Sequence, residues 1–425
     1  MVASARLACC ILLASLLAAL GCAKSRHYPA ADVAAMNRSF PVEPAVPFGI
    51  GDATIDVRKH EGDIRPFSTS VHDAPKPKTI LALSGGGMFG SYTAGVLNGW
   101  TKSGTRPVFD VVSGISTGGL IAPMAFVGPE YDAQMKLIYT RVTRRDVFTY
   151  RNWATIPFRE SIASTAPLRS IVDTAITDEL LLKVAAEHRK GRRLYVGTTN
   201  LDTRRFNTWD LGAIACRAES GERADLKATK ELFVDILIAS CSLPGIFPPV
   251  AIDVEIDGKK HTELHADGGV VSSVWVPTQV LDAAAPDPAK PAELHRPAEV
   301  YVILAGKAHP DPGEVGGSVF NVLTVFLNAA QAAQNRKDVS HLFHQSKVAG
   351  LNFRMTAVPS DFSTPAGGLE FDRTEMNRLY DEGFRIAENK QWWTSPPERG
   401  PGDVDPIRTG VKFKTAQRDA AERSK

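Results

Sequence analysis

A chain of 425 residues with 44% apolar composition can bury a large core, as one large domain or two small ones. Its basic residues nearly balance its acidic residues, and the net charge is +2. This balance argues against nucleic acid as a partner. Basic clusters occur at Arg141, Arg144 and Arg145 and at residues 189–193. We interpret them as solvated helix faces, with attraction to anionic lipid headgroups as the alternative.

The first 22 residues have the pattern of an export signal. One positive charge, Arg6, precedes an apolar run at residues 7–20 that is too short for an ordinary membrane span. Residues 19–22, Ala-Leu-Gly-Cys, resemble the cleavage box of bacterial lipoproteins, in which Cys22 would carry the lipid. Plain secretory cleavage and an uncleaved anchor are the alternatives. We expect an exported protein, anchored in the bacterial envelope through Cys22 or else periplasmic or secreted.

Composition divides the rest of the chain into three parts. Residues 23–78 are rich in proline, aspartate and arginine without sustained periodicity, which is typical of a tether and an irregular lead-in. We expect the main domain at residues 79–390, with a helical insertion at about 130–190. Residues 391–425 are polar, and we expect them to be disordered.

Only two of the five cysteines, Cys216 and Cys241, follow the expected signal segment. An oxidising compartment would permit a disulfide between them, but Cys241 lies in an apolar stretch that suits a buried thiol. We therefore favour two unpaired cysteines. The sequence contains neither Cys-x-x-Cys nor His-Glu-x-x-His, two patterns of redox and zinc sites.

A glycine-rich loop joins a buried strand expected at residues 79–83 to a helix expected at residues 92–102. Bare backbone N–H groups beside the positive end of a helix dipole can hold an anion or an oxyanion. The glycines of this loop are Gly85, Gly86, Gly87 and Gly90.

The same loop also satisfies the dinucleotide-binding pattern Gly-x-Gly-x-x-Gly. That pattern needs an acidic residue at the end of the next strand to bind a ribose. Asp110 has the required spacing but does not lie at the end of its strand, so the dinucleotide interpretation is weak. A triphosphate-binding loop is weaker still, because Gly-Lys-Ser/Thr is absent.

The second motif is Gly114-Ile-Ser116-Thr-Gly118, between an expected strand at residues 109–112 and an apolar helix at 120–127. A nucleophilic serine on a sharp strand-to-helix turn needs small neighbours, so that its hydroxyl projects and nearby amides face a developing oxyanion. Such a pentapeptide also arises by chance in glycine-rich loops. Its place between strand and helix makes Ser116 a candidate nucleophile.

Residues 130–190 separate this motif from the next buried strand and are the best candidate for a cap over a substrate. The other elements expected from periodicity and from helix breakers are two insertion helices at residues 131–141 and 178–189, strands at 194–199 and 205–210, a helix at 231–239, an apolar proline turn at 240–250, a strand at 300–305, a long helix at 318–344, a strand at 352–358 and a helix at 374–389.

The third motif is Asp267-Gly268-Gly269. If residues 261–267 are extended, His261, Glu263, His265 and Asp267 share one face of the strand. A metal site on this face is one alternative, although such polar faces are commonly just solvated, and we expect none. An ordinary turn, in which Asp267 bonds its own backbone, is the other alternative.

With these three motifs in this order, the sequence resembles the patatin-like phospholipase family over about residues 79–280, and less distinctly to 390. The resemblance implies a three-layer α/β/α sandwich around a mostly parallel sheet and a Ser–Asp dyad without histidine or cofactor. It also implies that membrane lipid or another acyl ester is the substrate. Carried over, Ser116 would be the nucleophile, Asp267 its partner, Gly85, Gly86 and Gly87 the oxyanion hole, and Gly90, Gly114, Gly118, Gly268 and Gly269 the supporting glycines.

One position departs from the family pattern. Members commonly have an arginine before the last glycine of the loop, where this chain has Phe89. The loss of this cation weakens the case for phosphate recognition and leaves the case for acyl-ester cleavage unchanged. It also keeps open an inactive, lipid-binding lipoprotein of the same fold. A Ser-His-Asp esterase that uses His265, His295 or His309 is the remaining alternative.

Overall fold

The computed structural model describes residues 28–30, 78–220, 222–256, 258–286, 296–309, 315, 317, 319–364 and 367–396. The expected signal segment with Cys22, most of the lead-in, His295 and the tail beyond residue 396 lie outside the described residues. Within the described part, no helix combines the length and the apolar character that a membrane span requires.

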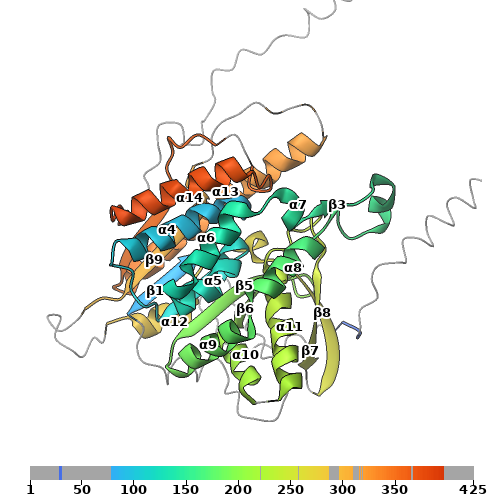
Figure 1. The fold of residues 1–425 in the computed structure, drawn as a ribbon, viewed down its shortest axis with the longest axis horizontal. Helices are drawn as coiled ribbons and strands as arrows, with labels where there is room; N and C mark the ends of the chain where they lie inside the picture. Colours follow the sequence, from blue (N-terminus) through green and yellow to red (C-terminus); the bar gives the residue numbers. More distant parts are fainter. Residues whose placement is uncertain are drawn as a thin grey trace, which may run out of the picture.

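Among the described residues, one eight-stranded sheet has the order β10-β9-β1-β2-β5-β8-β7, with β6 beside β5 (Figure 1). Strands β10, β9, β1, β2 and β5 are parallel, whereas β6 and β8 run antiparallel to β5, and β7 antiparallel to β8. The strands are β1 (Thr79–Leu83), β2 (Val111–Ile115), β5 (Arg193–Asn200), β6 (Arg205–Asp210), β7 (Val250–Ile256), β8 (Lys259–Asp267), β9 (Glu299–Lys307) and β10 (Asn352–Val358).

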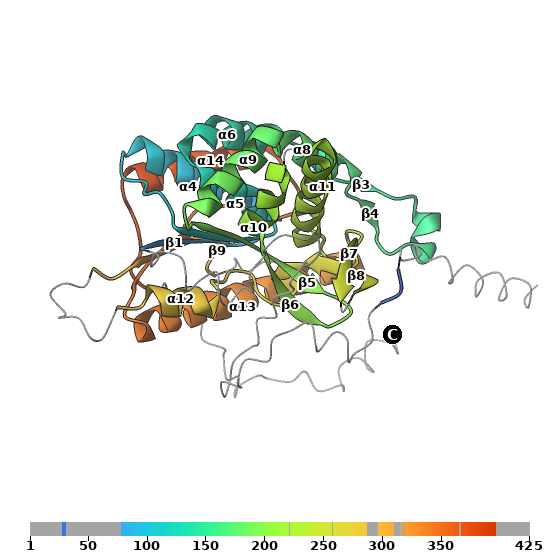
Figure 2. The same ribbon diagram turned by 90° about the horizontal axis from the view of Figure 1, so that it is seen from below.

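Helices cover both faces of this sheet (Figure 2). One face carries α12 (Thr278–Ala284) and α13 (Val319–Val348). The other carries α4 (Gly90–Lys102), α5 (Thr117–Val127), α6 (Asp132–Arg141), α8 (Ala166–Ala175), α9 (Asp178–Arg189), α10 (Leu211–Cys216), α11 (Arg223–Ser240) and α14 (Arg373–Glu388). The predicted α/β/α sandwich around a mostly parallel sheet is therefore confirmed.

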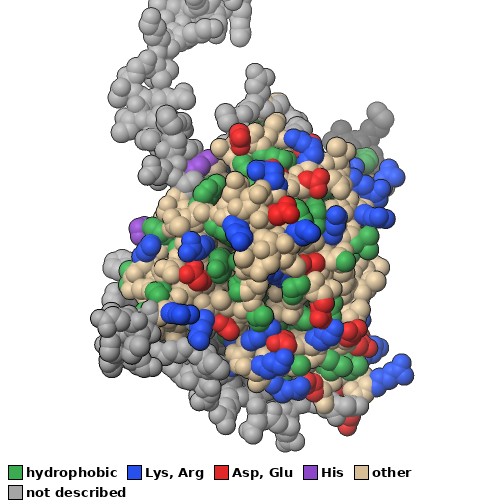
Figure 3. Space-filling view, turned by 60° about the vertical axis from the view of Figure 1, so that its left-hand side comes forward, with side chains coloured by type: hydrophobic (Ala, Val, Ile, Leu, Met, Phe, Trp, Pro, Cys, Tyr) green, Lys and Arg blue, Asp and Glu red, His purple; other side chains and the backbone are tan. Residues whose placement is uncertain are grey.

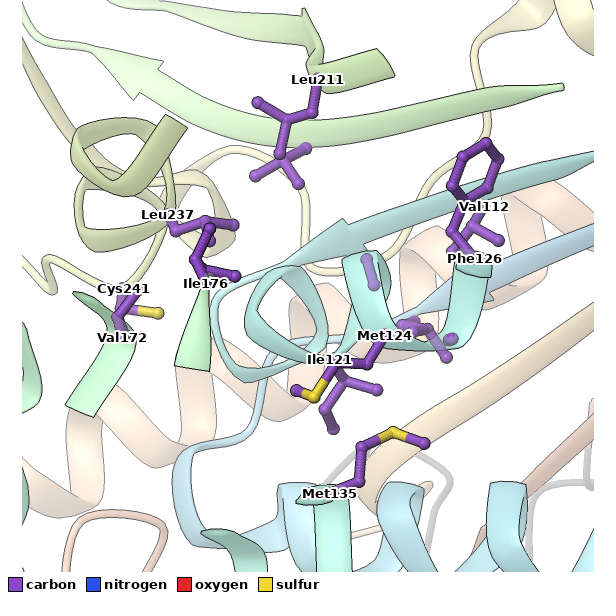
Figure 4. Packing of buried hydrophobic residues seen from close by; sticks show 14 of the residues in the cluster. Val112, Ile121, Met124, Phe126, Met135, Val172, Ile176, Leu211, Leu237 and Cys241 are labelled. Atoms are coloured by element: carbon purple, nitrogen blue, oxygen red, sulfur yellow. The ribbon is translucent and has the colours of Figure 1, made fainter. Parts of the chain in front are cut away.

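The sequence of β1 explains its central place. Leu81 and Leu83 point into the core beneath α4 and α5, while Ile80 and Ala82 point into the core beneath α12 and α13. A strand that is buried on both faces is apolar throughout, as parallel strands between two helical layers are. Helix α5 is apolar all round for the same reason, and Figure 4 shows its buried side chains among those of β2 and the surrounding helices.

The insertion contains more than the expected helices. Its helices α6 and α9 match the two predicted ones closely. Between them lies an unpredicted two-stranded hairpin of β3 (Thr149–Tyr150) and β4 (Ala163–Ser164), joined through the 3-10 helix η3 (Trp153–Phe158). Strands of two residues are too short to produce a detectable alternation of apolar and polar side chains.

The next strand, β2, begins two residues later than predicted. Asp110 precedes it, and its carboxylate accepts hydrogen bonds from the amides of Lys78 (2.8 Å) and Thr79 (3.0 Å) at the start of β1. Asp110 therefore joins the beginnings of two neighbouring strands. It lies at the opposite end of β1 from the glycine loop, and so it is not placed to bind a ribose there.

Candidate active site

Ser116 lies on a sharp turn between β2 and α5. Its backbone has φ 52° and ψ −126°, a conformation that residues other than glycine rarely adopt. The turn is held by hydrogen bonds from the N–H of Ser116 to the hydroxyl of Ser240 (2.9 Å), and from that hydroxyl to the carbonyl of Gly197 in β5 (2.7 Å). A strained turn that is held in this way presents its side chain in a fixed direction.

The glycines that flank Ser116 permit this turn. A Cβ at Gly114 would overlap the carbonyl of Gly118, and a Cβ at Gly118 would lie 2.5 Å from the carbonyl oxygen of Leu83. Gly90 likewise leaves room for Thr117, at the point where α4 and α5 begin side by side. Each of these positions therefore excludes a larger residue on steric grounds.

Strand β5 brings Ser116 and Asp267 together. Strand β6 occupies one edge of β5, and the other edge is shared by β2 and β8. Gly197 pairs with Ile115 at the end of β2, and the next residue, Thr198, pairs with Asp267 at the end of β8. Since β2 and β8 run in opposite directions, their carboxyl ends meet at this point. The hydroxyl of Ser116 lies near enough to the carboxyl group of Asp267 to lower its pKa.

Asp267 is 6% exposed and its carboxylate is held firmly. The N–H of Gly269 donates to its Oδ1 (2.7 Å), while its own N–H donates to the carbonyl of Ser242 (2.9 Å) and its carbonyl accepts from the hydroxyl of Thr199 (2.9 Å). Burial raises the pKa of Asp267 to about 7, because removal from water disfavours the charged form, and the bonds from Gly269 and Ser116 only partly offset this effect. The carboxyl group therefore titrates near neutral pH.

The two glycines after Asp267 serve this turn. A Cβ at Gly268 would lie 2.7 Å from the carbonyl oxygen of Gly197 and 3.2 Å from Cγ2 of Ile115. A Cβ at Gly269 would lie 3.0 Å from Oδ1 of Asp267. Asp267 accepts the local hydrogen bond of an ordinary turn, and it also lies beside Ser116. Both the turn interpretation and the dyad interpretation of this motif therefore describe part of its structure.

The glycine loop lies beside Ser116. A Cβ at Gly85 would be 3.1 Å from Cβ of Ser116. The N–H of Gly85 donates to the carbonyl of Ser273 (3.1 Å), so this amide is already occupied. In the described part of the chain, no carbonyl or side chain accepts a hydrogen bond from the N–H of Gly86 or Gly87. These two amides are consequently the candidate oxyanion donors of the three expected glycines.

Three further contacts support the site, and sequence reasoning did not single them out. Ser240 holds the serine turn, as described above. Asp338 of α13 accepts hydrogen bonds from the N–H (2.6 Å) and hydroxyl (3.0 Å) of Ser273, whose carbonyl holds Gly85. Cys241 lies near both residues of the dyad: burial, and to a smaller extent the charge of Asp267, raise the pKa of its thiol, while the Ser116 hydroxyl lowers it. No local sequence pattern marks these residues, because each acts across a long sequence separation.

His265 is one of the histidines considered for a Ser-His-Asp triad. His265 is fully buried, with Nδ1 3.0 Å from the hydroxyl of Thr198 and Nε2 3.3 Å from the carboxylate of Glu263. It thus lies on the same strand face as Asp267 but is bonded to other partners. The described residues contain no cluster of three or more metal-ligating side chains. Cys216 and Cys241 are both free, which confirms the prediction of unpaired thiols.

One family model matches part of this chain. Residues 81–282 match the family model described as patatin-like phospholipase. This segment is thus similar to the patatin-like phospholipase family. It includes the glycine loop, the serine turn and the Asp-Gly-Gly turn, so the patatin-like segment contains every residue of the candidate dyad and oxyanion hole.

Two solved structures are similar to the chain. VipD from Legionella pneumophila is 12% identical with a TM-score of 0.35, and the alignment covers 75% of this chain and 68% of VipD. The type III effector protein ExoU is 13% identical with a TM-score of 0.21, and the alignment covers 76% of this chain and 56% of ExoU. Both scores are below 0.5, so the assignment rests on the family model. No curated protein sequence gives a significant match.

Proposed function

We propose that this protein is a lipid acyl hydrolase that uses Ser116 as its nucleophile and Asp267 as the general base. The observation that supports the proposal is the meeting of β2 and β8 on one edge of β5, because it brings Ser116 close to the buried carboxyl group of Asp267. The family of residues 81–282 supports the same class of reaction.

The proposed reaction begins with the hydroxyl of Ser116. Asp267 takes the hydroxyl proton while Oγ attacks the ester carbonyl carbon, and the resulting oxyanion accepts hydrogen bonds from the amides of Gly86 and Gly87. Collapse of this intermediate expels the alcohol, which takes the proton from Asp267, and leaves an acyl-enzyme. Water then attacks the acyl carbon, loses a proton to Asp267 and releases the fatty acid together with the restored Ser116 hydroxyl.

The environment of Asp267 suits this role. An exposed aspartate is a poor base towards a serine hydroxyl, because its conjugate acid is too strong. A pKa of about 7 makes the carboxylate a better proton acceptor and still leaves it largely ionised just above neutral pH. The hydrogen bond from Gly269 fixes one carboxylate oxygen and thereby orients the group.

Substitution at each position of the dyad tests the proposal. Ser116→Ala and Asp267→Ala should each lower hydrolysis of a chromogenic acyl ester by at least about a thousandfold, and Ser116→Ala should abolish labelling by a fluorophosphonate probe. Ser170→Ala, an exposed serine of α8, is the matched control. Full activity in either dyad variant would refute the mechanism.

The same assays separate the alternatives. A Ser-His-Asp esterase would lose its activity in His265→Asn or His309→Asn, whereas the proposed dyad would not. An inactive lipid-binding protein would hydrolyse no ester and would leave the probe unattached to Ser116. Lipid profiling after incubation of the wild-type and Ser116→Ala proteins with a mixed membrane extract would identify the substrate, including whether phospholipid is cleaved with phenylalanine at position 89.

We further propose that the protein is exported and anchored to a membrane of the bacterial envelope through a lipid on Cys22. The charged start, the apolar run and the Ala-Leu-Gly-Cys sequence support this location. Mass spectrometry of the mature N-terminus should find a diacylglyceryl group on Cys22, and Cys22→Ser should release the protein from the membrane fraction. An unmodified N-terminus at another residue would contradict the anchor.

A further inference from the structure

The hairpin between α7 (Arg144–Val147) and α8 exposes three aromatic side chains. Residues 149–164, here called the aromatic hairpin, extend from the body of the protein beside α7 and α8 (Figures 1 and 2). Trp153 is 83% exposed, Tyr150 61% and Phe158 38%. Single exposed apolar residues are common on protein surfaces, but three aromatic rings within nine positions form a local apolar patch.

Positive charge surrounds this patch. Residues 141–160 contain five arginines and two acidic residues, a net charge of +3, whereas the whole chain carries only +2. The guanidinium of Arg144 lies 5.5 Å from the ring of Tyr150. Arg144 and Arg145 are exposed, and no carboxylate in the described part of the chain forms an ion pair with either. By contrast, the face in Figure 3 intersperses basic and acidic side chains.

The aromatic hairpin is attached next to the candidate active site. The N–H groups of Ile162 and Ala163 donate to the carbonyls of Gly245 (3.1 Å) and Ile246 (3.0 Å), in the proline turn that follows α11. The first residue after Cys241 in the same turn is Ser242, whose carbonyl accepts the N–H of Asp267. One short segment therefore links the base of the hairpin to the backbone of Asp267.

A second exposed apolar stretch adjoins the site from the opposite helical layer. The start of α13 exposes Val322, Val325 and Phe326, the last to 65%. Five residues further along, Oε1 of Gln331 lies 3.5 Å from where a Cβ on Gly269 would be. At 1.5 Å per residue, Phe326 is about 8 Å along the helix axis from the turn that holds Asp267.

We propose that the aromatic hairpin is a membrane-docking surface that seats the protein on an anionic phospholipid bilayer. Tryptophan and tyrosine favour the boundary between headgroups and acyl chains, and arginine binds anionic headgroups. The rings of Trp153, Tyr150 and Phe158 insert at this boundary while Arg144 and Arg145 contact the headgroups. The exposed start of α13 supplies a second contact. This binding to the bilayer is independent of the proposed reaction, because a protein without catalytic activity would still bind.

Quenching of tryptophan fluorescence by brominated acyl chains tests the docking directly. The experiment uses the full chain with Ser116→Ala, so that no lipid is cleaved, and with Cys22→Ser, so that no acyl chain is attached. Vesicles contain roughly one third anionic lipid or only zwitterionic lipid. At a vesicle concentration that binds both proteins completely, the difference in quenching between this chain and the same chain with Trp153→Phe reports on Trp153.

Charge variants complete the test. Arg144→Glu with Arg145→Glu removes two cations from the patch, whereas Lys259→Glu with Lys260→Glu changes two adjacent exposed cations at the far end of β8, about 27 Å along the strand from Asp267. The vesicle concentration for half-maximal quenching of Trp153 should rise about 30-fold or more in the first variant and less than threefold in the second.

Three results would overturn the proposal. The first is equal quenching with and without Trp153, which would keep this ring out of the bilayer. The second is equal quenching by anionic and zwitterionic vesicles, and the third is an equal effect of the two charge variants. Thermal unfolding of each variant, which should match the parent because all the altered side chains are exposed, excludes misfolding as the cause of a loss.

Discussion

The substitution Asp267→Asn should make the protein more stable while it removes the activity. Asparagine has nearly the shape of a protonated aspartic acid, and its Oδ1 can still accept the N–H of Gly269. The folded wild type binds its carboxyl proton with a pKa of about 7, compared with 3.8 for an exposed aspartate. Asparagine keeps the hydrogen bond and avoids the burial of a charge.

The sign and size of the effect follow from linkage. Between pH 4 and 7, the folded state retains a proton that the unfolded state has lost, so wild-type stability falls as the pH rises through this range. Each pH unit in the window corresponds to about 1.4 kcal/mol, which gives about 4 kcal/mol above pH 7. The variant has no titrating group at this position, so its free energy of unfolding should not show this decrease.

Urea unfolding of both proteins between pH 4 and pH 9 measures this difference. Other ionisable groups are common to both chains and cancel in the comparison. The free energy of unfolding of Asp267→Asn minus that of the wild type should increase by about 4 kcal/mol from pH 4 to pH 8 and then stay constant. A difference that is independent of pH, or that decreases as the pH rises, would refute the inference that burial of this carboxylate is costly.

Three other predictions concern the site. The kcat/KM for a soluble ester should rise with pH and level off above an apparent pKa of about 7, because the dyad's carboxyl group must be ionised; a flat profile from pH 5 to 9 would contradict this. Gly86→Ala would force a methyl group into the carbonyl of Ala305 and should lower kcat at least about a hundredfold, whereas Gly317→Ala, which meets no atom within 4 Å, should leave it unchanged. Asp338→Asn should weaken the hold on Ser273, lower kcat more than it raises KM, and cost about 1–3 kcal/mol in urea unfolding; an unchanged kcat would show that α13 does not position the glycine loop.

The local part of this arrangement was predictable from the sequence. The strand before the glycine loop has the predicted bounds, because a continuous apolar run between turn residues reflects burial on both faces. The strand at residues 352–358 also has the predicted bounds. The turn at Ser116 was equally clear, since strand, glycine-flanked serine and apolar helix follow one another directly. The antiparallel partner of β5 at residues 205–210 was also predicted correctly.

The long-range part was not predictable in the same way. That Asp267 pairs with Thr198 depends on strand β8 reaching the edge of β5 beyond β2, and no local pattern specifies this register. Strand β7, the hairpin partner of β8, was not predicted. It follows an apolar proline turn directly, so no polar turn residues mark where the strand begins. Ser240 and Asp338 were missed because a buried hydroxyl or carboxyl on a helix looks the same in sequence whether or not it holds a distant loop.

The shared edge of β5 has a consequence for how such a chain can change in length. Ser116 and Asp267 are 151 positions apart in the sequence, yet their separation in space is set by two consecutive residues of a single strand. Insertions or deletions in the intervening loops, including the segment with the aromatic hairpin, alter neither of those pairings. Surface segments of this fold are therefore free to acquire new binding properties while the geometry of the hydroxyl and the carboxyl group stays constant.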